Sequence, residues 1–590
     1  MDSAQKKETM TRKNDVVGWG QANAPWAKPT ANSISKAIAM RLCETGFRDA
    51  FGVLGGGIAP FAAGLSMSPL RFFHFRHEAG AGFAALEAHR VTGKPGLVIV
   101  TTGPGIFNVL NAVQAARSER AKLLLVTGFT PRTQVGRGAV QETSLASMPS
   151  ELLRPGSLFH DVALPETAEE LAVCLARLTR GFGAEGPFVA HLGLPLSLQT
   201  QLAECPFPTF GKWEYSQPVP SENVLSDCLD RLSDPTSLVW LGAGAEGAAF
   251  ALRDFVERAE LPVVCSPRAK GLFPENHRLF VGVSGAGGSR RVRDHFVKNR
   301  PNHVLVIGSR LGEVTSFLSQ DLCPQKSFVH VDIDQTAFGA AFPNTQGLGI
   351  VSDAKVFAES LLDRAQSTQW FSRQTKKVEL PPPAPQNKTF PRTQGLVHPV
   401  FLMQTIQDTV VDATDALVCS EAGTSFTWCN AHLRFSEPGR YRTSAAWGSM
   451  GHFTTGCVGA ALATGRRVVA VVGDGAMLMN NELNTAAHYG ANVLWVVLND
   501  AQLGLNEHGM VALGMRPVET QMPRTDFVAF AKSQGVAGLS VQTESELHAA
   551  FEQALSTSGP FLLDVAIDPT VPSPVIADRI ASLKRQAACG

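Results

Sequence analysis

Short apolar runs alternate along the chain with longer segments whose apolar residues are spaced like one face of a helix. The clearest pair of runs is Val468–Val472 and Val493–Leu498, and the segment between them starts amphipathic and ends at Gly490. Runs that are apolar on both faces are typical of buried parallel strands, and the segment that joins two of them is typically a crossover helix. This part of the chain is therefore predicted to form a βαβ unit.

The same alternation extends over most of the chain and predicts an α/β protein with three doubly wound parallel sheets. Two segments rich in proline, Cys205–Ser221 and Leu380–Pro385, separate the blocks, because proline interrupts helices and central strands. The three blocks are expected at residues 31–203, 221–367 and 395–571.

Both ends of the chain are expected to lie outside these blocks. Residues 1–30 are polar, lack the apolar stretch of a secretion signal, and are expected to form a flexible arm. Residues 572–590 begin with prolines and continue with a helical pattern, so they are expected to be either a lid or a frayed end.

Composition and charge narrow the classes of partner. Lysine plus arginine and aspartate plus glutamate each number 52 in 590 residues, which gives no electrostatic case for nucleic acid or an anionic membrane. No apolar run approaches the ~18–20 residues that cross a bilayer. The ten cysteines form no CxxC pair, which favours reduced thiols in a cytoplasm over disulfides or a zinc site.

Polar side chains follow the two apolar runs described first. Asp474 comes directly after one run, and Asn499 and Asp500 end the other. Ligands of open parallel sheets lie beyond the carboxyl ends of strands, so these groups are expected to converge. Their oxygens suit a hard divalent cation such as Mg²⁺ that bridges a bound diphosphate. The alternative is that Asp474 only caps a helix.

Further short motifs precede this unit, and their order is informative. They are Gly55-Gly56-Gly57, Arg76-His77-Glu78-Ala79, Thr102-Gly103-Pro104-Gly105 with Asn108, Gln141-Glu142-Thr143 and Gly448-Ser449-Met450-Gly451. Together with Gly473-Asp474-Gly475 they resemble the thiamine diphosphate enzymes of the acetohydroxyacid synthase, pyruvate oxidase and benzaldehyde lyase group. The resemblance covers nearly the whole chain after residue 30. It implies a pyrimidine-binding, a central and a diphosphate-binding domain, in that order.

The resemblance also implies which residues contact the cofactor: Gly55, Gly56, Gly103, Pro104, Asn108, Gly423, Thr424, Gly448, Ser449, Met450, Gly473, Asp474, Gly475 and Ala476. Glu78 would be the acid at the pyrimidine ring nitrogen that activates the cofactor, and Met450 would hold the two rings of the cofactor in a V. The alternatives are a carboxylate in the first turn of a helix for Glu78 and ordinary core filling for Met450.

The cation site departs from the family pattern. Counted back from Gly504, the position of the family's second ligand falls on Asp500, where the family has Asn, and the segment from Asp474 is one residue short. We expect Asp474, Asp500 and the backbone carbonyl of Gln502 to bind Mg²⁺, with Asn499 as the alternative to Asp500.

The expected substrate pocket departs further. Val140 stands where the synthases have Phe, and Gly509 stands where they have an acceptor-selecting Trp. Both changes remove bulk, so we expect a donor or acceptor larger than pyruvate and 2-oxobutyrate. Gln141 is the candidate that hydrogen-bonds a substrate oxygen. His452 and His508 are either acid–base groups or ordinary core or surface histidines.

The middle block is similar to the domain that holds FAD in the synthases and oxidases. Residues 282–289 and 308–316 resemble the segments that contact FAD there, yet only Arg310 and the glycines carry over. Many relatives keep this fold without flavin, so the sequence leaves FAD open and favours its absence.

The sequence thus predicts a thiamine diphosphate- and Mg²⁺-dependent enzyme that decarboxylates a 2-oxo acid and ligates the acyl group to an acceptor carbonyl. The alternatives are a 2-oxo acid decarboxylase or oxidase, a diketone hydrolase, and a scaffold subunit without catalysis. Because the family places Glu78 and the diphosphate site on different subunits, a homodimer or homotetramer with active sites between chains is expected.

Overall fold

The computed structural model describes residues 33–144, 147–203, 216–374, 380, 396–576 and 579–581. The predicted arm 1–30, most of the segment 205–221, the prolines of 380–385 and most of the tail 572–590 lie outside the described residues.

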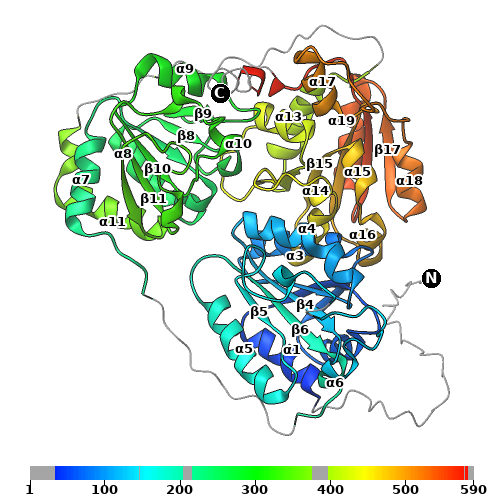
Figure 1. The fold of residues 1–590 in the computed structure, drawn as a ribbon. Coiled ribbons are helices and arrows are strands. Elements are labelled where there is room, and N and C mark those ends of the chain that lie inside the picture. Colours follow the sequence, from blue (N-terminus) through cyan, green and yellow to red (C-terminus); the bar gives the residue numbers. More distant parts are fainter. Residues whose placement is uncertain are drawn as a thin grey trace, which may run out of the picture.

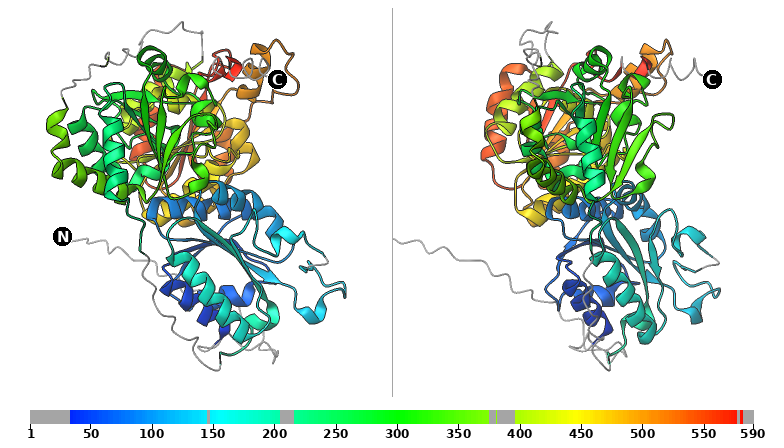
Figure 2. Two further views of the ribbon diagram at one scale, coloured as in Figure 1. Left: turned by 60° about the vertical axis from the view of Figure 1, so that its left-hand side comes forward. Right: turned by 90° about the vertical axis from the view of Figure 1, so that its left-hand side faces the viewer.

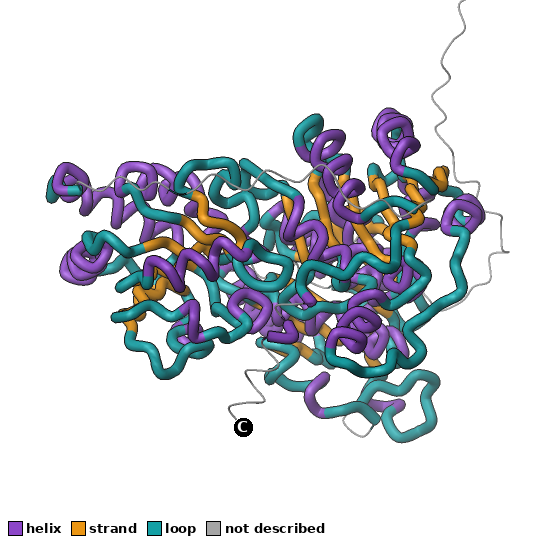
Figure 3. The backbone as a smooth tube through the Cα atoms, turned by 90° about the horizontal axis from the view of Figure 1, so that it is seen from above, coloured by secondary structure: helices purple, strands orange, loops and turns teal. Residues whose placement is uncertain are grey.

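Three six-stranded sheets form the framework, and all their strand pairs are parallel. Figure 1 shows the first, blue to cyan, below the second, green, and the third, yellow to red. The first stays below the other two in the turned views of Figure 2. Seen from above, the helices flank the strands of the upper two units, which lie side by side (Figure 3). The predicted fold class of three doubly wound α/β units is confirmed.

The first sheet has the order β2-β1-β3-β4-β6-β5. Its strands are β1 (Asp49–Val53), β2 (Arg71–His74), β3 (Gly96–Val100), β4 (Lys122–Phe129), β5 (Asp161–Ala163) and β6 (Phe188–Pro195). The helices are α1 (Ile34–Glu44), α2 (Ala59–Leu65), α3 (Glu78–Thr92), α4 (Pro104–Ser118), α5 (Ala168–Gly183) and α6 (Leu196–Gln199).

The second sheet has the order β12-β11-β10-β7-β8-β9. Its strands are β7 (Leu238–Leu241), β8 (Val263–Cys265), β9 (Phe280–Val283), β10 (His303–Ile307), β11 (Ser327–Asp332) and β12 (Gly347–Val351). The helices are α7 (Glu222–Leu232), α8 (Ala249–Ala259), α9 (Arg290–Asn299), α10 (Glu313–Ser316) and α11 (Ala354–Ser367).

The third sheet has the order β14-β13-β15-β16-β18-β17. Its strands are β13 (Leu417–Ser420), β14 (Tyr441–Thr443), β15 (Val468–Gly473), β16 (Val493–Asn499), β17 (Ala537–Val541) and β18 (Phe561–Ala566). The helices are α12 (Pro399–Ile406), α13 (Thr424–His432), α14 (His452–Thr464), α15 (Asp474–Met479), α16 (Leu483–Tyr489), α17 (Gly504–Ala512), α18 (Phe527–Ser533) and α19 (Leu547–Ser556).

The first and third sheets share one strand order, so the chain contains two copies of the same topology on either side of a different middle unit. In each copy the strand at the edge, β2 or β14, leads into a helix, α3 or α14. These two helices pack directly against each other. A side chain at Gly459 would lie 2.3 Å from the Ala84 carbonyl oxygen, so glycine permits this close approach. Both helices are therefore apolar on most sides, as buried helices are.

The predicted βαβ unit forms, but its connection is not one helix. β15 and β16 occupy the two apolar runs, and Gly490 ends the connection in the left-handed conformation. Between them the chain forms α15 and α16 with an extended residue, Asn480, where one continuous helix was expected. The Asn480 carbonyl oxygen accepts a hydrogen bond from the Thr454 hydroxyl at 2.6 Å, which holds the break against α14. The sequence prediction of a single crossover helix was wrong because this contact comes from another element.

Candidate active site

Asp474 lies at the carboxyl end of β15, next to the end of β16. Its two carboxylate oxygens accept the backbone N–H groups of Gly475 at 2.7 Å and Ala501 at 2.8 Å. Asp500 directly precedes Ala501, and both aspartates are buried. Burial, and then the charge of Asp500, raises the pKa of Asp474 to about 7, and burial raises the pKa of Asp500 to about 6. Two neighbouring buried carboxylates whose charged forms are disfavoured fit a divalent cation between them.

Asn499, the other ligand candidate, is engaged elsewhere through its amide nitrogen, while its Oδ1 is buried without a hydrogen-bond partner among the residues that the structure describes. Its Nδ2 donates to the Asp564 carboxylate at 2.8 Å and to the Thr525 carbonyl oxygen at 3.0 Å. Its side chain therefore faces β18 and the loop before α18. Gln502, whose backbone carbonyl was expected at the cation, donates from Nε2 to the Pro569 carbonyl oxygen at 3.1 Å.

Open space adjoins the backbone at several of the predicted cofactor contacts. A side chain at Gly423, Gly448 or Gly473 would meet no atom within 4 Å. Gly423 has a φ of 111° and precedes Thr424, the first residue of α13. The N–H groups of a helix start attract anions, so the turn at Thr424 fits a diphosphate.

Met450 reaches the same edge of the third sheet. A side chain at Gly475 would lie 3.5 Å from the Met450 Cε and 2.8 Å from the Leu503 Cδ2, so glycine leaves room for both. Ala476 follows in α15 and is buried. Gly451, which directly follows Met450, has a φ of 87° and immediately precedes α14. The Met450 side chain thus lies between this glycine turn and the end of β15.

The loop before α14 contacts α4 of the first unit in the same chain. Asn111 donates from Nδ2 to the Ser449 hydroxyl at 2.7 Å and accepts from the Trp447 indole at 2.9 Å. Asn108, one helical turn earlier on α4, donates to the Glu78 carboxylate at 3.0 Å. Glu78 is the first residue of α3 and is half-buried. One face of α4 therefore connects the predicted activating acid with the loop that carries Met450.

Gln141 is held in a strained conformation beside the start of α4. Its φ of 56° lies in the left-handed region, which is uncommon outside glycine and concentrates at functional sites. Its Oε1 accepts a hydrogen bond from the Thr102 hydroxyl at 3.0 Å. Gly103 has a φ of 62°, and a side chain there would lie 2.8 Å from the Gln141 Cβ. Pro104 then begins α4.

Two further predicted positions of the first unit lie in the turn after β1. A side chain at Gly55 would lie 2.6 Å from the Thr101 hydroxyl, so the close approach of this turn to β3 requires glycine. Open space adjoins Gly56. Val140, next to Gln141, is 91% exposed in the single chain.

The ring nitrogens that bond in the two candidate histidines are engaged by other groups of the chain and not by this edge of the third sheet. His452 is fully buried, its ring stacks on Phe83 and Phe453, and its Nε2 hydrogen-bonds the Glu87 carboxylate at 2.9 Å. The Nε2 of His508 is engaged by the Pro569 carbonyl oxygen at 2.9 Å. The geometry favours structural roles for both.

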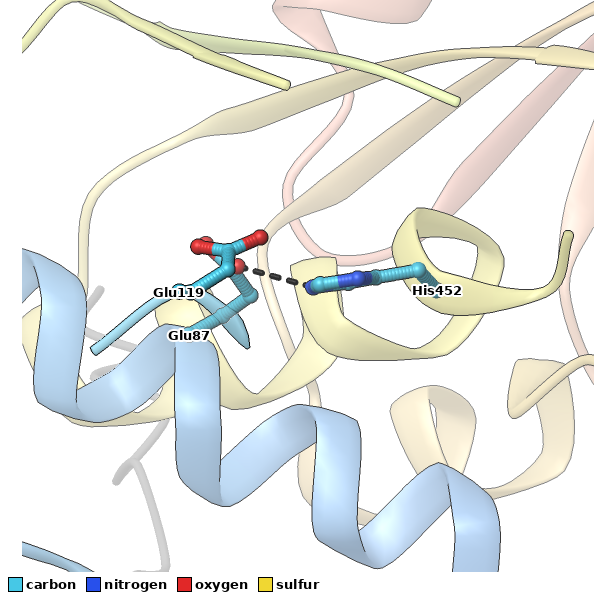
Figure 4. Close-up of side chains that lie close together, drawn as sticks. All are labelled: Glu87, Glu119 and His452. Atoms are coloured by element: carbon cyan, nitrogen blue, oxygen red, sulfur yellow. Dashed lines mark hydrogen bonds and ion pairs between the residues drawn. The ribbon is translucent and has the colours of Figure 1, made fainter. Parts of the chain in front are cut away.

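Figure 4 shows His452 pointing at Glu87, with Glu119 beside them. The ligand atoms of these three buried residues lie within 4.8 Å of one another, the spacing of a metal site. Arg442 of β14, however, donates to Glu87 at 2.8 Å and to Glu119 at 3.0 Å. The guanidinium already supplies the charge that a cation would bring, so we interpret the group as an ion network.

The network joins all three units of the chain. Glu87 lies on α3 and Glu119 follows α4, while Arg268 from the second unit donates to Glu119 at 2.9 Å. Burial opposes the charged form of both glutamates, yet the guanidinium of Arg442 beside Glu87 and that of Arg268 beside Glu119 hold both pKa values below their ordinary range. Because burial makes a broken pair costly, the network fixes how the units meet.

Besides Glu87 and Glu119, two more buried glutamates were not predicted from the sequence. Glu421 accepts the backbone N–H groups of Phe453 at 2.7 Å and Thr454 at 3.1 Å, at the start of α14. Glu482 accepts N–H groups at the start of α3, which belongs to another unit. No local sequence pattern predicts such a hydrogen bond, because its donor and acceptor are far apart in sequence.

Two cavities adjoin these elements. One of about 650 Å³ lies between the first and second units and is lined by Arg90, Arg120, Arg268 and Arg310, among others. Another of about 270 Å³ lies beside α17; it is lined chiefly by apolar residues, with Gly509 among them, and extends to the described part of the tail. No helix in the described part of the chain is long and apolar enough to cross a membrane.

Comparison with known families gives three matches in sequence order. Residues 32–148 match the N-terminal TPP binding domain of thiamine pyrophosphate enzymes, residues 229–361 their central domain, and residues 421–565 their C-terminal TPP binding domain. Together the three matches cover more than half of the chain.

Similar proteins are found over most of the chain's length. The putative acetolactate synthase large subunit IlvB2 of Mycobacterium tuberculosis is 29% identical over 85% of this chain and 91% of its own length. The acetolactate synthase isozyme 1 large subunit of Escherichia coli is 25% identical over 89% of this chain and 92% of its own. The putative thiamine pyrophosphate-containing protein YdaP of Bacillus subtilis is 26% identical over 91% and 92%.

Proposed function

The chain belongs to the thiamine pyrophosphate enzymes, and on that premise we propose that it decarboxylates a 2-oxo acid and joins the acyl group to the carbonyl carbon of an acceptor. The observation that carries this proposal is the edge of the third sheet, where the buried carboxylates Asp474 and Asp500 lie beside the loop of Met450. The similarity to acetolactate synthase large subunits supports the carboligase assignment.

Thiamine diphosphate, when bound, supplies the carbanion chemistry and acts as an electron sink. Glu78 would hold a proton at the pyrimidine nitrogen, and its hydrogen bond from Asn108 keeps its carboxyl group in place. Met450 would support the cofactor from below with its apolar side chain. Gln141 would donate its amide N–H to a substrate oxygen, since its Oε1 is engaged by Thr102.

We propose Mg²⁺ as the metal, bound by Asp474, Asp500 and the backbone carbonyl of Gln502. The raised pKa values of the two aspartates support this, because a bound cation would offset the negative charge that burial disfavours. Asn499 is the weaker candidate because its amide nitrogen donates to Asp564 and to the Thr525 carbonyl oxygen, and these bonds hold the side chain toward β18.

The acceptor is proposed to be larger than pyruvate or 2-oxobutyrate. Gly509 lines the cavity of about 270 Å³ beside α17, whose other lining residues include Leu503, Met510, Leu513 and Ile576. A glycine at this position leaves apolar space that a larger side chain would fill. An acceptor with an apolar substituent fits this lining.

FAD is not part of the proposal. Each arginine that lines the cavity between the first two units is already paired with a carboxylate of the chain: Arg90 and Arg268 with Glu119, and Arg120 and Arg310 with Asp334. A flavin diphosphate would have to compete with these carboxylates for its cations. The visible absorption spectrum of the purified protein tests this, since bound flavin is yellow.

We further propose a homo-oligomer in a reducing, cytoplasmic compartment. Large apolar side chains around the candidate site are exposed in the single chain, namely Val140, Met479, Trp447 and Phe107, and a second copy would cover them. The eight cysteines that the structure describes are all free thiols.

The proposal is tested by titrating the protein with thiamine diphosphate and Mg²⁺ in a calorimeter and then screening 2-oxo acid donors against carbonyl acceptors with mass spectrometry. Binding followed by a ligated product supports it. Binding followed by release of an aldehyde, an oxidised acid or a cleaved diketone replaces carboligation with decarboxylation, oxidation or hydrolysis. Glu78→Gln should abolish turnover while thiamine diphosphate stays bound. If the unaltered protein does not bind thiamine diphosphate, the function that remains is that of a scaffold subunit without catalysis.

A further inference from the structure

The residues just before Glu78 are held by the third unit of the same chain. The end of β2 at His74 and the residues that connect it to α3 contact α16 and the residue before it. Glu482 directly precedes α16. Its carboxylate accepts the backbone N–H groups of Arg76 at 3.1 Å and His77 at 3.0 Å. Tyr489, at the other end of α16, accepts the backbone N–H of His74 through its hydroxyl at 2.8 Å.

The Glu482 carboxylate occupies a site that is shaped for it. Its side chain is buried, with 1% of the residue exposed, and it also accepts a hydrogen bond from the Thr485 hydroxyl. A side chain at Gly80 would lie 2.5 Å from the Glu482 Oε1, so glycine in the first turn of α3 makes room for the carboxylate. Such a placement needs both units to be docked.

The contact satisfies groups that α3 cannot satisfy itself. Arg76 and His77 directly precede α3, so their N–H groups have no partner within the helix. The side chain of His77 caps the N–H of Ala79 at 3.1 Å. An anion at a helix start is also favoured by the helix dipole. Glu482 therefore fixes both the position and the direction of the first turn, on which Glu78 is the first residue.

We propose that Glu482 is a positioning residue for Glu78: from the third unit it fixes the start of α3, and thereby the direction from which the Glu78 carboxyl group meets the pyrimidine nitrogen of the cofactor. The inference rests on the proposed function, because it gives Glu78 the activating role. It adds that the same chain's third unit sets the geometry of that acid. Burial shields this carboxylate from water and raises the pKa of Glu482 to about 7.

The test uses the full-length protein with thiamine diphosphate and Mg²⁺ bound. The measured quantity is the rate at which the cofactor's C2 proton exchanges with deuterium, together with the cofactor's dissociation constant. Glu482→Gln should slow the exchange by about tenfold or more, because small displacements of a catalytic group have effects of up to about a hundredfold. The dissociation constant should stay within about threefold, because the diphosphate contacts are unchanged.

A double-mutant cycle separates positioning from general structural damage. If Glu482 acts through Glu78, then Glu78→Gln with Glu482→Gln should exchange no more slowly than Glu78→Gln alone. Effects that multiply would overturn the inference. Glu546→Gln is the matched control, because Glu546 also accepts two backbone N–H groups at a helix start of the third unit, from Gln542 at 2.7 Å and Thr543 at 3.0 Å. It should leave the exchange rate unchanged.

Tyr489→Phe covers the case in which Glu482→Gln does not fold. It removes only the hydroxyl that accepts the His74 N–H, and it should slow C2 exchange by a smaller factor, about threefold, since one of three backbone contacts is lost. If every variant that folds and binds the cofactor exchanges the C2 proton at the unaltered rate, the role of Glu482 is overturned and the proposed function still stands. Failure of the unaltered protein to bind thiamine diphosphate would overturn the proposed function and this inference with it.

Discussion

The Asp474 carboxylate accepts the backbone N–H of Ala501 at 2.8 Å, and this bond ties the end of β15 to the end of β16. Ala501 has a φ of 57°, a conformation that a residue other than glycine keeps only when its surroundings hold it. Asn499 and Asp500, the two residues before this turn, contact different groups. Asp500 remains near Asp474, while the amide of Asn499 is directed to Asp564.

This difference predicts separate effects for the two ligand candidates. Asp500→Ala should weaken Mg²⁺-dependent binding of thiamine diphosphate by about tenfold or more, since a charged ligand to the cation is lost. Asn499→Ala should leave that affinity within about threefold but lower the free energy of unfolding by about 1–3 kcal/mol, because the buried Asp564 loses a donor. Calorimetry with and without Mg²⁺ and denaturant unfolding measure the two effects.

Asp500→Asn refines the comparison, because it restores the residue type that the resembled family has at this position. We expect it to retain most of the affinity, since an amide oxygen also binds Mg²⁺. A large loss of affinity in Asn499→Ala, with none in Asp500→Ala, would assign the ligand to Asn499.

The buried ion network predicts how stability depends on pH. The pKa values of Glu87 and Glu119 are lower in the folded chain than the ordinary 4.5, so their charge stabilises the fold fully above about pH 4.5 and this contribution is lost as pH falls further. Glu119→Gln should lower the free energy of unfolding at neutral pH by about 3–5 kcal/mol, because Arg442 and Arg268 lose a buried partner. Its stability should also fall less steeply than that of the unaltered protein below pH 4.5.

Urea unfolding across that pH range measures both effects. Glu257→Gln is the control, since Glu257 pairs with Arg253 at the surface, where ion pairs contribute about 0–1 kcal/mol. Equal slopes below pH 4.5 for Glu119→Gln and the unaltered protein would show that the network does not control acid unfolding.

The sequence predicted the fold class because its apolar runs carry the sheet directly. The ends of β15 and β16 agree with the predicted apolar runs to within one residue. Strands that are buried on both faces are apolar at successive positions, so their bounds can be read from the sequence. The family, too, could be identified from short motifs around Glu78, Gln141 and Met450.

The sequence did not predict the contacts that join the units. The break at Asn480 depends on the hydroxyl of Thr454, and the role of Glu482 depends on the backbone of a helix some four hundred residues earlier in the chain. The network of Glu87, Arg442 and His452 likewise combines groups whose spacing in sequence carries no signal. Such pairs of residues can be identified only from a structure in which the domains are packed together.

The apolar cavity beside α17 predicts how substrate choice can be narrowed. Gly509→Trp should fill the space that Leu503 and Met510 line and lower kcat/KM for large acceptors by about tenfold or more, while pyruvate as acceptor is affected less. Competition between a small and a large acceptor in one reaction measures the ratio. Gly514→Ala is the control for disturbance of the adjacent backbone. Gly514 lies just beyond α17 with a φ of 74°, and it does not line the cavity. An unchanged ratio in Gly509→Trp would remove this cavity from the substrate site.

The last prediction concerns which copy of the chain supplies each half of the active site. In one chain, α4 contacts both Glu78 and the loop of Ser449, so the two halves lie near each other without a partner. The exposed side chains of Val140 and Met479 beside both halves nevertheless favour a second copy, as in the family that the chain resembles.

Mixing two inactive variants decides between these arrangements. If the halves come from different copies, a dimer of one Glu78→Gln and one Asp474→Ala chain contains one intact site and one doubly altered site. Random exchange of subunits should then restore about a quarter of the unaltered activity, because about half of the dimers are mixed and half of their sites are intact. Glu78→Gln mixed with Glu78→Gln,Asp474→Ala is the control and should stay inactive in either arrangement. If the first mixture also stays inactive while native mass spectrometry shows mixed dimers, each site is built within one chain, on the side of α4 where Asn111 contacts Ser449.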